Sequence, residues 1–399
     1  MKHISRTVLI LSLVSFFTDV ASEMLYPVMP IYLGSIGFSV VLIGVLEGFA
    51  EAIAGLSKGY FGKMSDINGK RLPFIQWGYA LSALSKPMMG TFVYPLWIFL
   101  ARTMDRFGKG IRTGARDAML SDETTKENKA KVFGFHRTMD TFGAVVGPVS
   151  ALVYLYFRPG DYRTLFFIAF APGILALLST VILKEKKKPD HSATEKVKLV
   201  DFISYLKKGP AMYKRLLIGL LVFALFNSSD VILLLKAKES GMDDTYVIGM
   251  YILYNLSYAL LALPMGILAD KLGLKIIFIT GLLIFAAVYF SMAIATSTAV
   301  ITGLFLLYGA FSAATEGISK AWISNICEKK DTATAIGTYA GMQSICTMLA
   351  SSICGLIWYY YGAAATFIVT GSITVLVIIY FVWQVREQSA SEASAPSSF

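Results

Sequence analysis

The stretch WIFLARTMDRFGKGIRTGARDAMLSD, residues 97–122, combines the apolar character of a membrane helix with an unusual number of charges. Its charged side chains recur every three or four residues, at Arg102, Asp105, Arg106, Lys109, Arg112 and Arg116. At about 100° per residue, this spacing places all six on one face of a helix. A charge facing lipid costs at least about 2.5–3.5 kcal/mol at mid-bilayer, so this face should meet other helices or a water-filled cavity. The stretch therefore predicts a membrane helix with a functional, mainly cationic stripe.

The C-terminal end of this stretch allows a second interpretation. Arg116 and Asp117, and with them Arg112, can lie simply at the cytoplasmic interface of the membrane, where basic residues are common. Arg102 and Arg106 lie deeper in the apolar run, so this alternative applies to them much less.

The composition of the whole chain is that of a membrane protein. Of its 399 residues, 56% are hydrophobic and 16% are charged, and the mean hydropathy is +0.63. Soluble domains contain about 25% charged residues, so the sequence predicts an all-α membrane protein that crosses the bilayer many times. The net charge of +10 comes largely from short polar segments between apolar runs, which is typical of membrane topology and not of nucleic-acid binding. No nucleic-acid partner is expected.

Apolar runs of about 20 residues, the length of one membrane crossing, predict twelve transmembrane helices. They lie near residues 8–33, 40–62, 74–94, 96–119, 131–156, 164–183, 214–235, 245–268, 276–296, 299–325, 333–360 and 364–384. The first run is longer than a signal peptide and is interpreted as a span. Lysine and arginine gather in the loops of one side, which predicts that this side and both termini face the cytoplasm.

A polar, lysine-rich segment divides the chain into two halves. We expect an N-terminal six-helix bundle over 1–183, a cytoplasmic linker over 184–213, a C-terminal six-helix bundle over 214–384 and a disordered tail over 385–399.

An internal repeat supports this division. The loop after the second span reads GKMSDINGKR and contains Gly62, Asp66, Gly69 and Arg71. The loop after the eighth span reads GILADKLGLK and contains Gly266, Asp270, Gly273 and Lys275. The two aspartates are 270 − 66 = 204 residues apart, about half the chain. Glycine permits a tight turn, and aspartate can cap a helix N-terminus or pair with an arginine of a neighbouring helix, so we expect these loops to act in conformational switching.

These loops, which share the pattern GxxxDxxGx(R/K), resemble the signature loop of the major facilitator superfamily and its repeat in the second half. In the fifth span, GAVVGPVSA resembles the GxxxGPxxGG motif of proton-coupled antiporters in that superfamily, although the two final glycines of the motif are not present. Its Gly143, Gly147 and Pro148 are candidates for a gate, and close helix packing explains them equally well. The strings DRFGKGIRTGARDAML, FFTDVASEMLYPVMPIYL, NSSD and ATEG resemble a bacterial branch of the superfamily.

The resemblance covers nearly the whole chain and implies a secondary active transporter in which two six-helix bundles rock around a midplane site. The predicted conformational switch is the set Gly62, Asp66, Gly69, Arg71, Gly143, Gly147, Pro148, Gly266, Asp270 and Gly273.

Acidic residues occur in pairs within the first two spans. Asp19 and Glu23 are one helical turn apart, as are Glu47 and Glu51, so each pair shares a face. Two close carboxylates cannot both ionise easily, and one is expected to hold a proton near neutral pH. These pairs are therefore candidate proton carriers. Two alternatives remain open: paired oxygens can bind a divalent metal, or the acids only neutralise the cationic stripe.

Other charged and polar groups complete the expected cavity. Asp230 lacks a cation within one turn and is a functional candidate, whereas Glu316 and Lys320 have i,i+4 spacing and are expected to form an internal ion pair. The predicted substrate- and proton-binding set is Asp19, Glu23, Glu47, Glu51, Arg102, Asp105, Arg106, Lys109, Arg112, Arg137, Asp140, Asn227 and Asp230.

Several arginines able to bind carboxylate or phosphate bidentately favour an anionic or zwitterionic solute. We therefore predict proton-coupled export of such a small molecule by a monomer in the inner membrane of a bacterium, with protons and the lipid bilayer as its other partners. A divalent metal exporter, a cationic drug exporter, a lipid flippase and a transporter-like sensor remain alternatives. The histidines are scattered, and no Walker loop or cysteine cluster is present, so no enzyme activity, cofactor or structural metal is expected.

Overall fold

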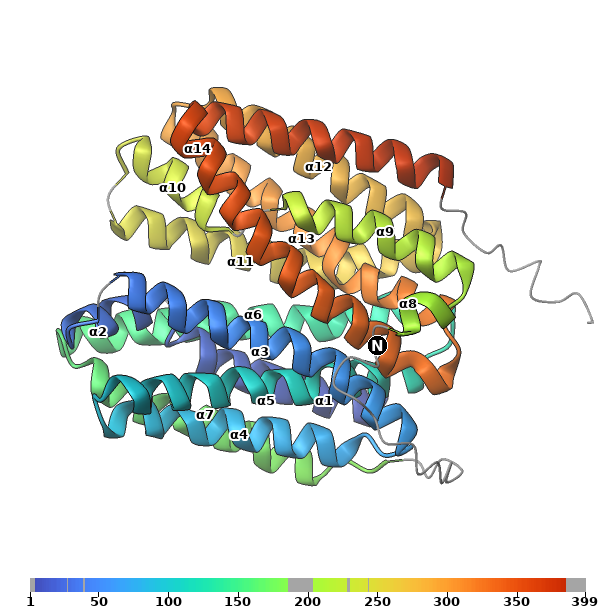
Figure 1. Ribbon diagram of the computed structural model, residues 1–399, viewed down its shortest axis with the longest axis horizontal. Helices are drawn as coiled ribbons and strands as arrows, with labels where there is room; N and C mark the ends of the chain where they lie inside the picture. Colours follow the sequence, from blue (N-terminus) through green and yellow to red (C-terminus); the bar gives the residue numbers. More distant parts are fainter. Residues whose placement is uncertain are drawn as a thin grey trace, which may run out of the picture.

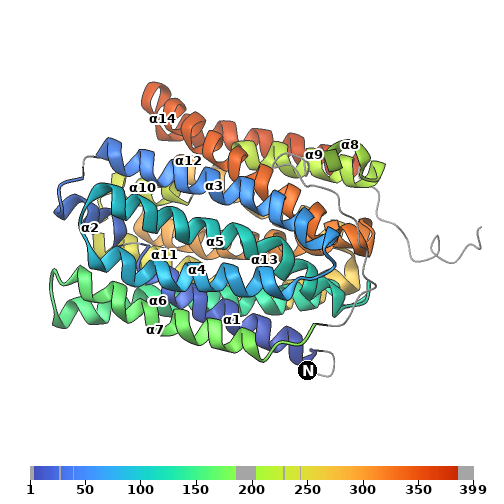
Figure 2. The same cartoon turned by 60° about the horizontal axis from the view of Figure 1, so that its bottom comes forward.

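The computed structural model describes residues 4–26, 28–38, 40–185, 204–227, 230–242 and 244–384. Two helical bundles lie side by side along the long axis of the molecule (Figures 1 and 2). The first bundle contains α1 (Arg6–Glu23), α2 (Met29–Ser35), α3 (Val40–Ile67), α4 (Leu72–Thr91), α5 (Pro95–Asp122), α6 (Lys129–Phe157) and α7 (Tyr162–Val181). The second follows the short α8 (Ser204–Lys208) and contains α9 (Ala211–Phe226), α10 (Val231–Glu239), α11 (Asp244–Leu272), α12 (Leu274–Ile294), α13 (Thr298–Ile326), η2 (Lys329–Asp331) and α14 (Thr332–Gln384).

Six described segments are long and apolar enough to cross a membrane. They are Lys129–Phe157, Tyr162–Val181, Gly249–Leu272, Leu274–Ile294, Thr298–Ile326 and Lys329–Trp383. The last contains two predicted spans, because α14 is interrupted at Gly362, where φ is 83°. Only glycine adopts such a backbone readily, so this residue allows the chain to reverse between the two spans.

The first and seventh predicted spans are not single helices, which corrects the ranges 8–33 and 214–235. The first helix ends at Glu23 and resumes as α2, and the seventh span ends at Phe226 and resumes as α10. Pro27 has no N–H to donate and disfavours a helical conformation of the residue before it. The NSSD segment, residues 227–230, is rich in short polar side chains, a residue type that is unfavourable in helix interiors. The two breaks are 226 − 23 = 203 residues apart, so they occupy corresponding places in the two halves.

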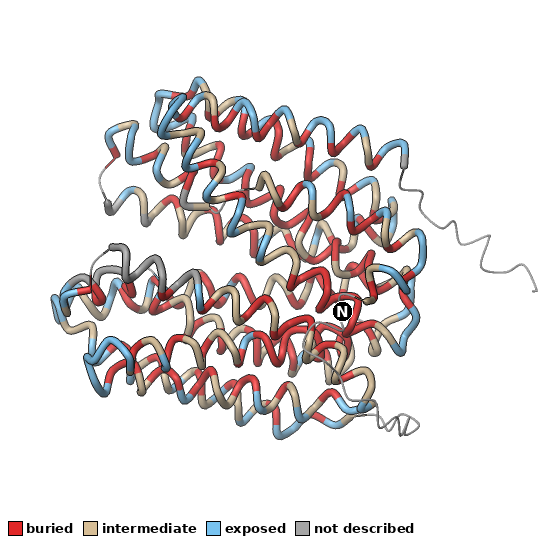
Figure 3. Tube along the Cα trace, in the orientation of Figure 1, coloured by how far each residue is buried: buried red, intermediate tan, exposed pale blue. Residues whose placement is uncertain are grey.

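The two bundles meet mainly at one end of the molecule, which we call the linker end. Here α3, α5, α11 and α13 finish and α4, α6, α12 and α14 begin; the opposite end is the far end. Between the bundles, α3 packs against α14 and α6 packs against α11. Buried residues are dense where the bundles meet at the linker end, near the label N (Figure 3). This packing positions the charged residues described next.

Candidate functional site: a charged interface between the bundles

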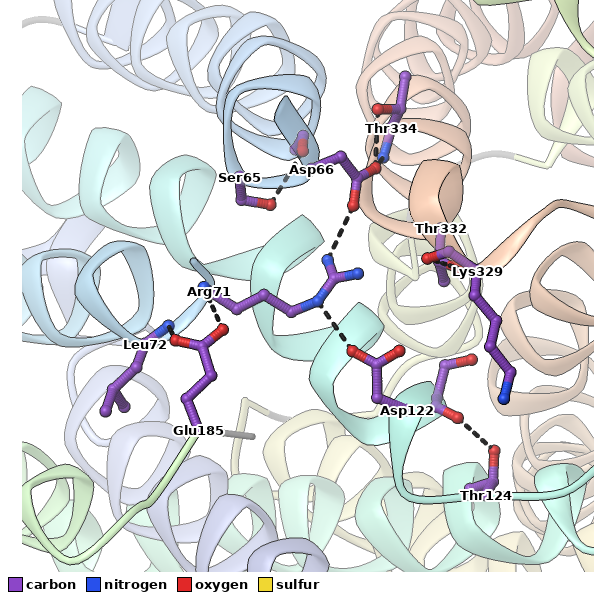
Figure 4. A network of polar contacts seen from close by, with 12 residues as sticks. Ser65, Asp66, Arg71, Leu72, Asp122, Thr124, Glu185, Lys329, Thr332 and Thr334 are labelled. Carbon is purple, nitrogen blue, oxygen red and sulfur yellow. Dashed lines mark hydrogen bonds and ion pairs between the residues drawn. The ribbon is translucent and has the colours of Figure 1, made fainter. Parts of the chain in front are cut away.

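Asp66, beyond the predicted span 40–62, joins the two bundles at the linker end (Figure 4). Its Oδ2 accepts hydrogen bonds from the amide nitrogen of Thr334 at 2.6 Å and from its hydroxyl at 2.8 Å, at the start of α14. Its Oδ1 lies 2.9 Å from Arg71, whose Nε lies 2.9 Å from Asp122. Burial raises the pKa of Asp66 to about 6, while Arg71 and Thr334 act in the opposite direction. The carboxylate therefore caps a helix of the opposite bundle and neutralises a buried arginine of its own.

Asp270 repeats the capping contact in the opposite direction. Its two carboxylate oxygens accept hydrogen bonds from the amides of Ala130 at 2.9 Å and Lys131 at 2.7 Å, at the start of α6. Ala130 and Thr334 are 334 − 130 = 204 residues apart, the same offset as the two aspartates. An anion at a helix N-terminus satisfies free N–H groups and the helix dipole. The repeated loops are therefore a pair of reciprocal caps between the bundles.

The repeated glycines permit the close approach that these caps require. A Cβ on Gly62 would lie 2.5 Å from the carbonyl oxygen of Ala333, and one on Gly266 would lie 2.4 Å from that of Ala130. Gly69 and Gly273 have φ values of 61° and 104°, so they form the expected tight turns.

The charged stripe of α5 is divided between several neighbours, and much of it faces other helices, which is one of the two expected environments. Lys86 of α4 lies 2.7 Å from the carboxylate of Asp105, and Arg102 approaches the same group at 3.5 Å. Arg112 donates to the hydroxyl of Ser82 at 2.9 Å and lies over the ring of Tyr79. All these charged residues are buried, because α5 packs between α3 and α4 and its wide stripe reaches both. Arg102, Asp105 and Arg112 therefore hold the first bundle together.

Lys109, in contrast, is exposed in the middle of α5. Its ammonium group forms no hydrogen bond or ion pair with the described residues, and its electrostatic neighbours are Arg106, Glu51, Asp19 and Glu23. Arg106 lies 3.9 Å from Glu51, whose side chain is 38% exposed. Because charges facing lipid are costly, these groups indicate a water-accessible space between the bundles. The side chain of Glu47 lies outside the described residues.

At each of the two helix breaks, an acidic residue accepts a hydrogen bond from a tyrosine of the second bundle. Glu23 accepts a hydrogen bond from Tyr251 at 3.2 Å, and Tyr26 stacks on Tyr251 with ring centroids 6.3 Å apart. Asp230 accepts a hydrogen bond from Tyr308 at 2.9 Å and has Glu23 among its electrostatic neighbours.

Asp19 and Asn227 complete this region. Asp19 is half-buried and, within the described part of the chain, forms no hydrogen bond or ion pair. The side-chain oxygen of Asn227 is buried without a partner in the same set of residues. Asn227 lines a pocket together with Glu316, Tyr339 and Gln343.

A second group of charges bridges the bundles between this space and the linker end. Arg137 pairs with Asp140 at 2.7 Å and donates to the hydroxyl of Tyr258 in α11. Asp117 lies 2.9 Å from Arg116 and 2.7 Å from Lys320 of α13. These pairs line a pocket that also contains His136 and Glu316.

Two sequence-based interpretations change as a result. Arg116 and Asp117 lie between the bundles, with side chains that are 11% and 1% exposed, and not on an open surface. Lys320 pairs with Asp117, and no ion pair between Glu316 and Lys320 is present in the described chain, because Asp117 lies opposite on α5. The predicted binding set also does not contain Tyr258, which accepts a hydrogen bond from Arg137. The available signal for Lys320 is the offset 320 − 117 = 203, which places both partners at nearly equivalent positions of the two halves.

The glycines of the fifth span lie inside the first bundle. A Cβ on Gly143 would lie 2.5 Å from the carbonyl oxygen of Phe16, and one on Gly147 would lie 2.7 Å from the amide of Met24. They allow α6 to approach α1 beside Asp19 and Glu23. A gating role for Gly143, Gly147 and Pro148 stays a prediction.

The fold and the site define a multi-pass helical membrane protein whose two bundles share a charged interface. The family model described as Major Facilitator Superfamily matches residues 11–252 and 231–398, so the chain belongs to this superfamily of membrane transporters. The two-bundle, twelve-span fold expected from the sequence is confirmed.

Named relatives agree with this assignment. The uncharacterized MFS-type transporter MJ1317 of Methanocaldococcus jannaschii is 31% identical over 363 residues, which are 90% of this chain and 89% of the relative. Quinolone resistance protein NorA of Staphylococcus aureus is 26% identical over 172 residues, 43% of each chain. The crystal structure of the human organic anion transporter MFSD10 (TETRAN) superposes with a TM-score of 0.84 at 15% identity, over 94% of this chain and 99% of that one.

Proposed function

We propose that this protein exports a small zwitterionic or anionic solute from the cytoplasm in exchange for protons, by alternating access. The observation that carries the proposal is Lys109, an exposed cation in mid-helix that has no ion-pair partner among the described residues, with Arg106 beside it and the acids Asp19, Glu23 and Glu51 around it. A solute anion can pair with Lys109, and the acids can exchange protons.

The closed linker end supports the alternating-access part of the proposal. Asp66 and Asp270 cap helices of opposite bundles there, so opening this end breaks both caps together. We place the linker end in the cytoplasm, and the positive-inside pattern supports this orientation. The structure then corresponds to a carrier that is closed toward the cytoplasm.

The side chains that the two bundles offer to the space between them support a zwitterion in particular. Lys109 and Arg106 offer cations from the first bundle. Glu23, Asp230, Tyr26 and Tyr251 offer carboxylates and aromatic faces near the C-terminal ends of α1 and α9, which favour a cationic group. The names of two relatives, an organic anion transporter and a quinolone resistance protein, are compatible with a small organic solute. Among the described residues no group of three or more His, Cys, Asp or Glu side chains is placed to hold a metal, so we do not propose the metal alternative.

A matched set of ligands tests the solute class. Thermal unfolding of the detergent-purified protein is measured with amino-acid-like zwitterions, with their methyl esters, which are only cationic, and with their N-acetyl forms, which are only anionic. We expect a zwitterion to raise the unfolding temperature most. A ligand that binds the native state stabilises it by RT ln(1 + [L]/Kd), so the tightest ligand has the largest effect. In the Lys109→Met variant, the carboxylate of the ligand should no longer add to the rise in unfolding temperature. In Lys126→Met, which changes an exposed loop, it should still do so.

The compounds that bind are then tested for counterflow and for uptake into inverted proteoliposomes with a proton gradient. Stabilisation by the esters alone, unchanged in Lys109→Met, would replace the proposal by a cationic drug exporter. Solute transport that does not depend on the proton gradient would contradict proton coupling.

A further inference from the structure

A pocket inside the second bundle lies between α9, α13 and α14. The described residues that line it all belong to this bundle, so a rigid-body movement of one bundle against the other leaves the pocket intact. Its apolar side is formed by phenylalanines, and its opposite side is polar. The polar lining includes Asn227 of α9, Glu316 and Ser319 of α13, and Tyr339, Gln343 and Thr347 of α14.

Two primary amides of this lining have no hydrogen-bond partner in the part of the chain that the structure describes. The side chain of Gln343 is half-buried and forms no hydrogen bond there. The side-chain oxygen of Asn227 is buried and also lacks a partner. A primary amide has one acceptor oxygen and two N–H donors, and leaving them unpaired away from bulk water costs free energy. These two side chains therefore offer open donors and acceptors to a group that enters the pocket.

The open groups of the pocket are neutral. Among the described lining residues, Glu316 is the only charged one, and its carboxylate has Arg137 of α6 as a charge partner. Ser319 donates to the carbonyl oxygen of Thr315 at 2.7 Å, and the Tyr339 hydroxyl has Ser319 as its hydrogen-bond partner. The amides thus remain as the unsatisfied groups. They match a neutral group that both donates and accepts hydrogen bonds better than an ammonium or a carboxylate.

Aromatic rings close the apolar side of the pocket. Phe223 and Phe311 both line it, and their ring centroids lie 5.9 Å apart. Each also packs on Phe285, at 5.1 Å and 4.7 Å between centroids. All three rings are buried in a packed core, which yields little space to a ligand. A short side chain therefore fits this pocket better than a long one.

The pocket lies beside the charged space between the bundles. Asp230 follows Asn227 by three residues and has both Glu316 of the pocket and Glu23 of the first bundle among its electrostatic neighbours. Glu23 and Asp230 are the carboxylates proposed above to favour the cationic group of the solute. The side chain of a zwitterion that binds there is therefore directed to the pocket with the two amides.

We propose that Asn227 and Gln343 are specificity-determining residues that bind a short, uncharged side chain of the solute, one that carries an amide or a hydroxyl group. This inference rests on the zwitterionic solute proposed above and adds the class of its side chain. A solute of the same shape with an apolar side chain leaves both amides unpaired, so it binds less tightly.

Ligand pairs of similar shape test this assignment. Asparagine is compared with leucine, and threonine with valine, because the members of each pair differ mainly in their hydrogen-bonding groups. Dissociation constants are measured by isothermal titration calorimetry on the detergent-purified protein. Since two hydrogen bonds are involved, we expect wild type to bind asparagine at least about fivefold more tightly than leucine. The same pairs are then measured as methyl esters and as N-acetyl forms.

Apolar variants locate the preference. Asn227→Leu and Gln343→Met should each lower the preference for asparagine over leucine by about 2–12-fold, the contribution of one hydrogen bond. The unfolding temperature of the ligand-free variants should not fall, because each change removes an unpaired polar group. A purely structural role predicts the opposite, a lower unfolding temperature with an unchanged preference. Gln343→Asn and Asn227→Ser, which keep a hydrogen-bonding group, should retain part of the preference.

A glutamine of the first bundle provides the matched control. The amide of Gln76 donates to the carbonyl oxygen of Thr180, so Gln76→Met removes a half-buried amide outside the pocket and should leave the ligand preference unchanged. If Asn227→Leu or Gln343→Met does not give folded protein, Asn227→Ala or Gln343→Ala takes its place.

The outcomes separate this inference from the proposed function. Equal affinity of wild type for asparagine and leucine overturns it, as does a preference that survives both apolar variants or that Gln76→Met also removes. Failure of every compound in the set to bind overturns it too. A preference among the methyl esters, without any advantage of the zwitterions, would support the side-chain site and contradict the zwitterionic solute. Tight binding of zwitterions whatever their side chain would give the reverse result.

Discussion

The two copies of the signature loop have the same geometry at unequal electrostatic strength. Asp66 and Asp270 each cap the first turn of a helix in the opposite bundle, with amide contacts of 2.6–2.9 Å. Only the first copy is joined to a buried ion-pair network through Arg71 and Asp122. In the described residues Asp270 forms no ion pair within 4.0 Å. The comparison indicates that both copies of the repeat act as helix caps between the bundles. The added charges make the contact of the first copy the stronger of the two.

Replacing Asp66 should have the largest effect. Asp66→Asn removes the charge from the cap and leaves Arg71 with Asp122 alone, and breaking a buried ion pair in this way costs about 3–5 kcal/mol. Gradient-driven transport in proteoliposomes should fall by at least about 100-fold, because the linker end no longer closes stably. Membrane expression and a monodisperse elution profile should remain near wild type. Normal transport by this variant would show that Asp66 is not needed to close the linker end. A loss of membrane-inserted protein would show that the residue is needed for folding.

Gly62→Ala and Gly266→Ala form a matched pair that should have equal effects. Each added Cβ would lie about 2.5 Å from a carbonyl oxygen of the opposite bundle, so the bundles must move apart. Overpacking of this kind costs about 1–3 kcal/mol, which corresponds to about 5–150-fold in the open-to-closed ratio. Accessibility of a cysteine at the linker end to a hydrophilic maleimide should rise similarly in both. A large effect at Gly62 alone would mean that the symmetry of the backbone contact does not extend to its energetics.

Asp270→Asn should be milder than Asp66→Asn. The amide oxygen can still accept one hydrogen bond, and loss of a cap costs about 0.5–2 kcal/mol. We expect transport to fall several-fold under the conditions that abolish it in Asp66→Asn. The double variant measures the coupling of the two loops. If Asp270→Asn equals Asp66→Asn in severity, the ion-pair network of the first copy adds nothing.

The sequence was sufficient for the fold and for the repeated loops, because both depend on local patterns. Apolar runs mark the spans, and the 204-residue offset marks the duplication. It did not predict the breaks after Glu23 and Phe226, since hydropathy is averaged over a window longer than either break. The sequence also predicted that the α5 charges share one face of the helix, and an isolated helix has this arrangement. Which of them meet Lys86, Glu51 or Lys320 depends on the helices packed around α5, and one sequence does not determine those contacts.

The smallest effect is expected for Glu185, which adds a further contact to the first copy alone. Its carboxylate accepts hydrogen bonds from the amides of Arg71 at 2.5 Å and Leu72 at 3.1 Å, at the N-terminus of α4 (Figure 4). It therefore holds the helix start from which Arg71 reaches Asp66, and among the described residues it forms no hydrogen bond or ion pair with the opposite bundle. Glu185→Gln keeps one acceptor oxygen and loses the favourable interaction of a charge with the helix N-terminus, which is worth about 0.3–1 kcal/mol. Transport should fall about twofold at low ionic strength and less in high salt, because salt screens this interaction. Glu123→Gln, a charge-matched change at the neighbouring end of α5, serves as the control. A loss as large as that of Asp270→Asn would show that the position of Arg71, and not the cap on α14, limits closure of the linker end.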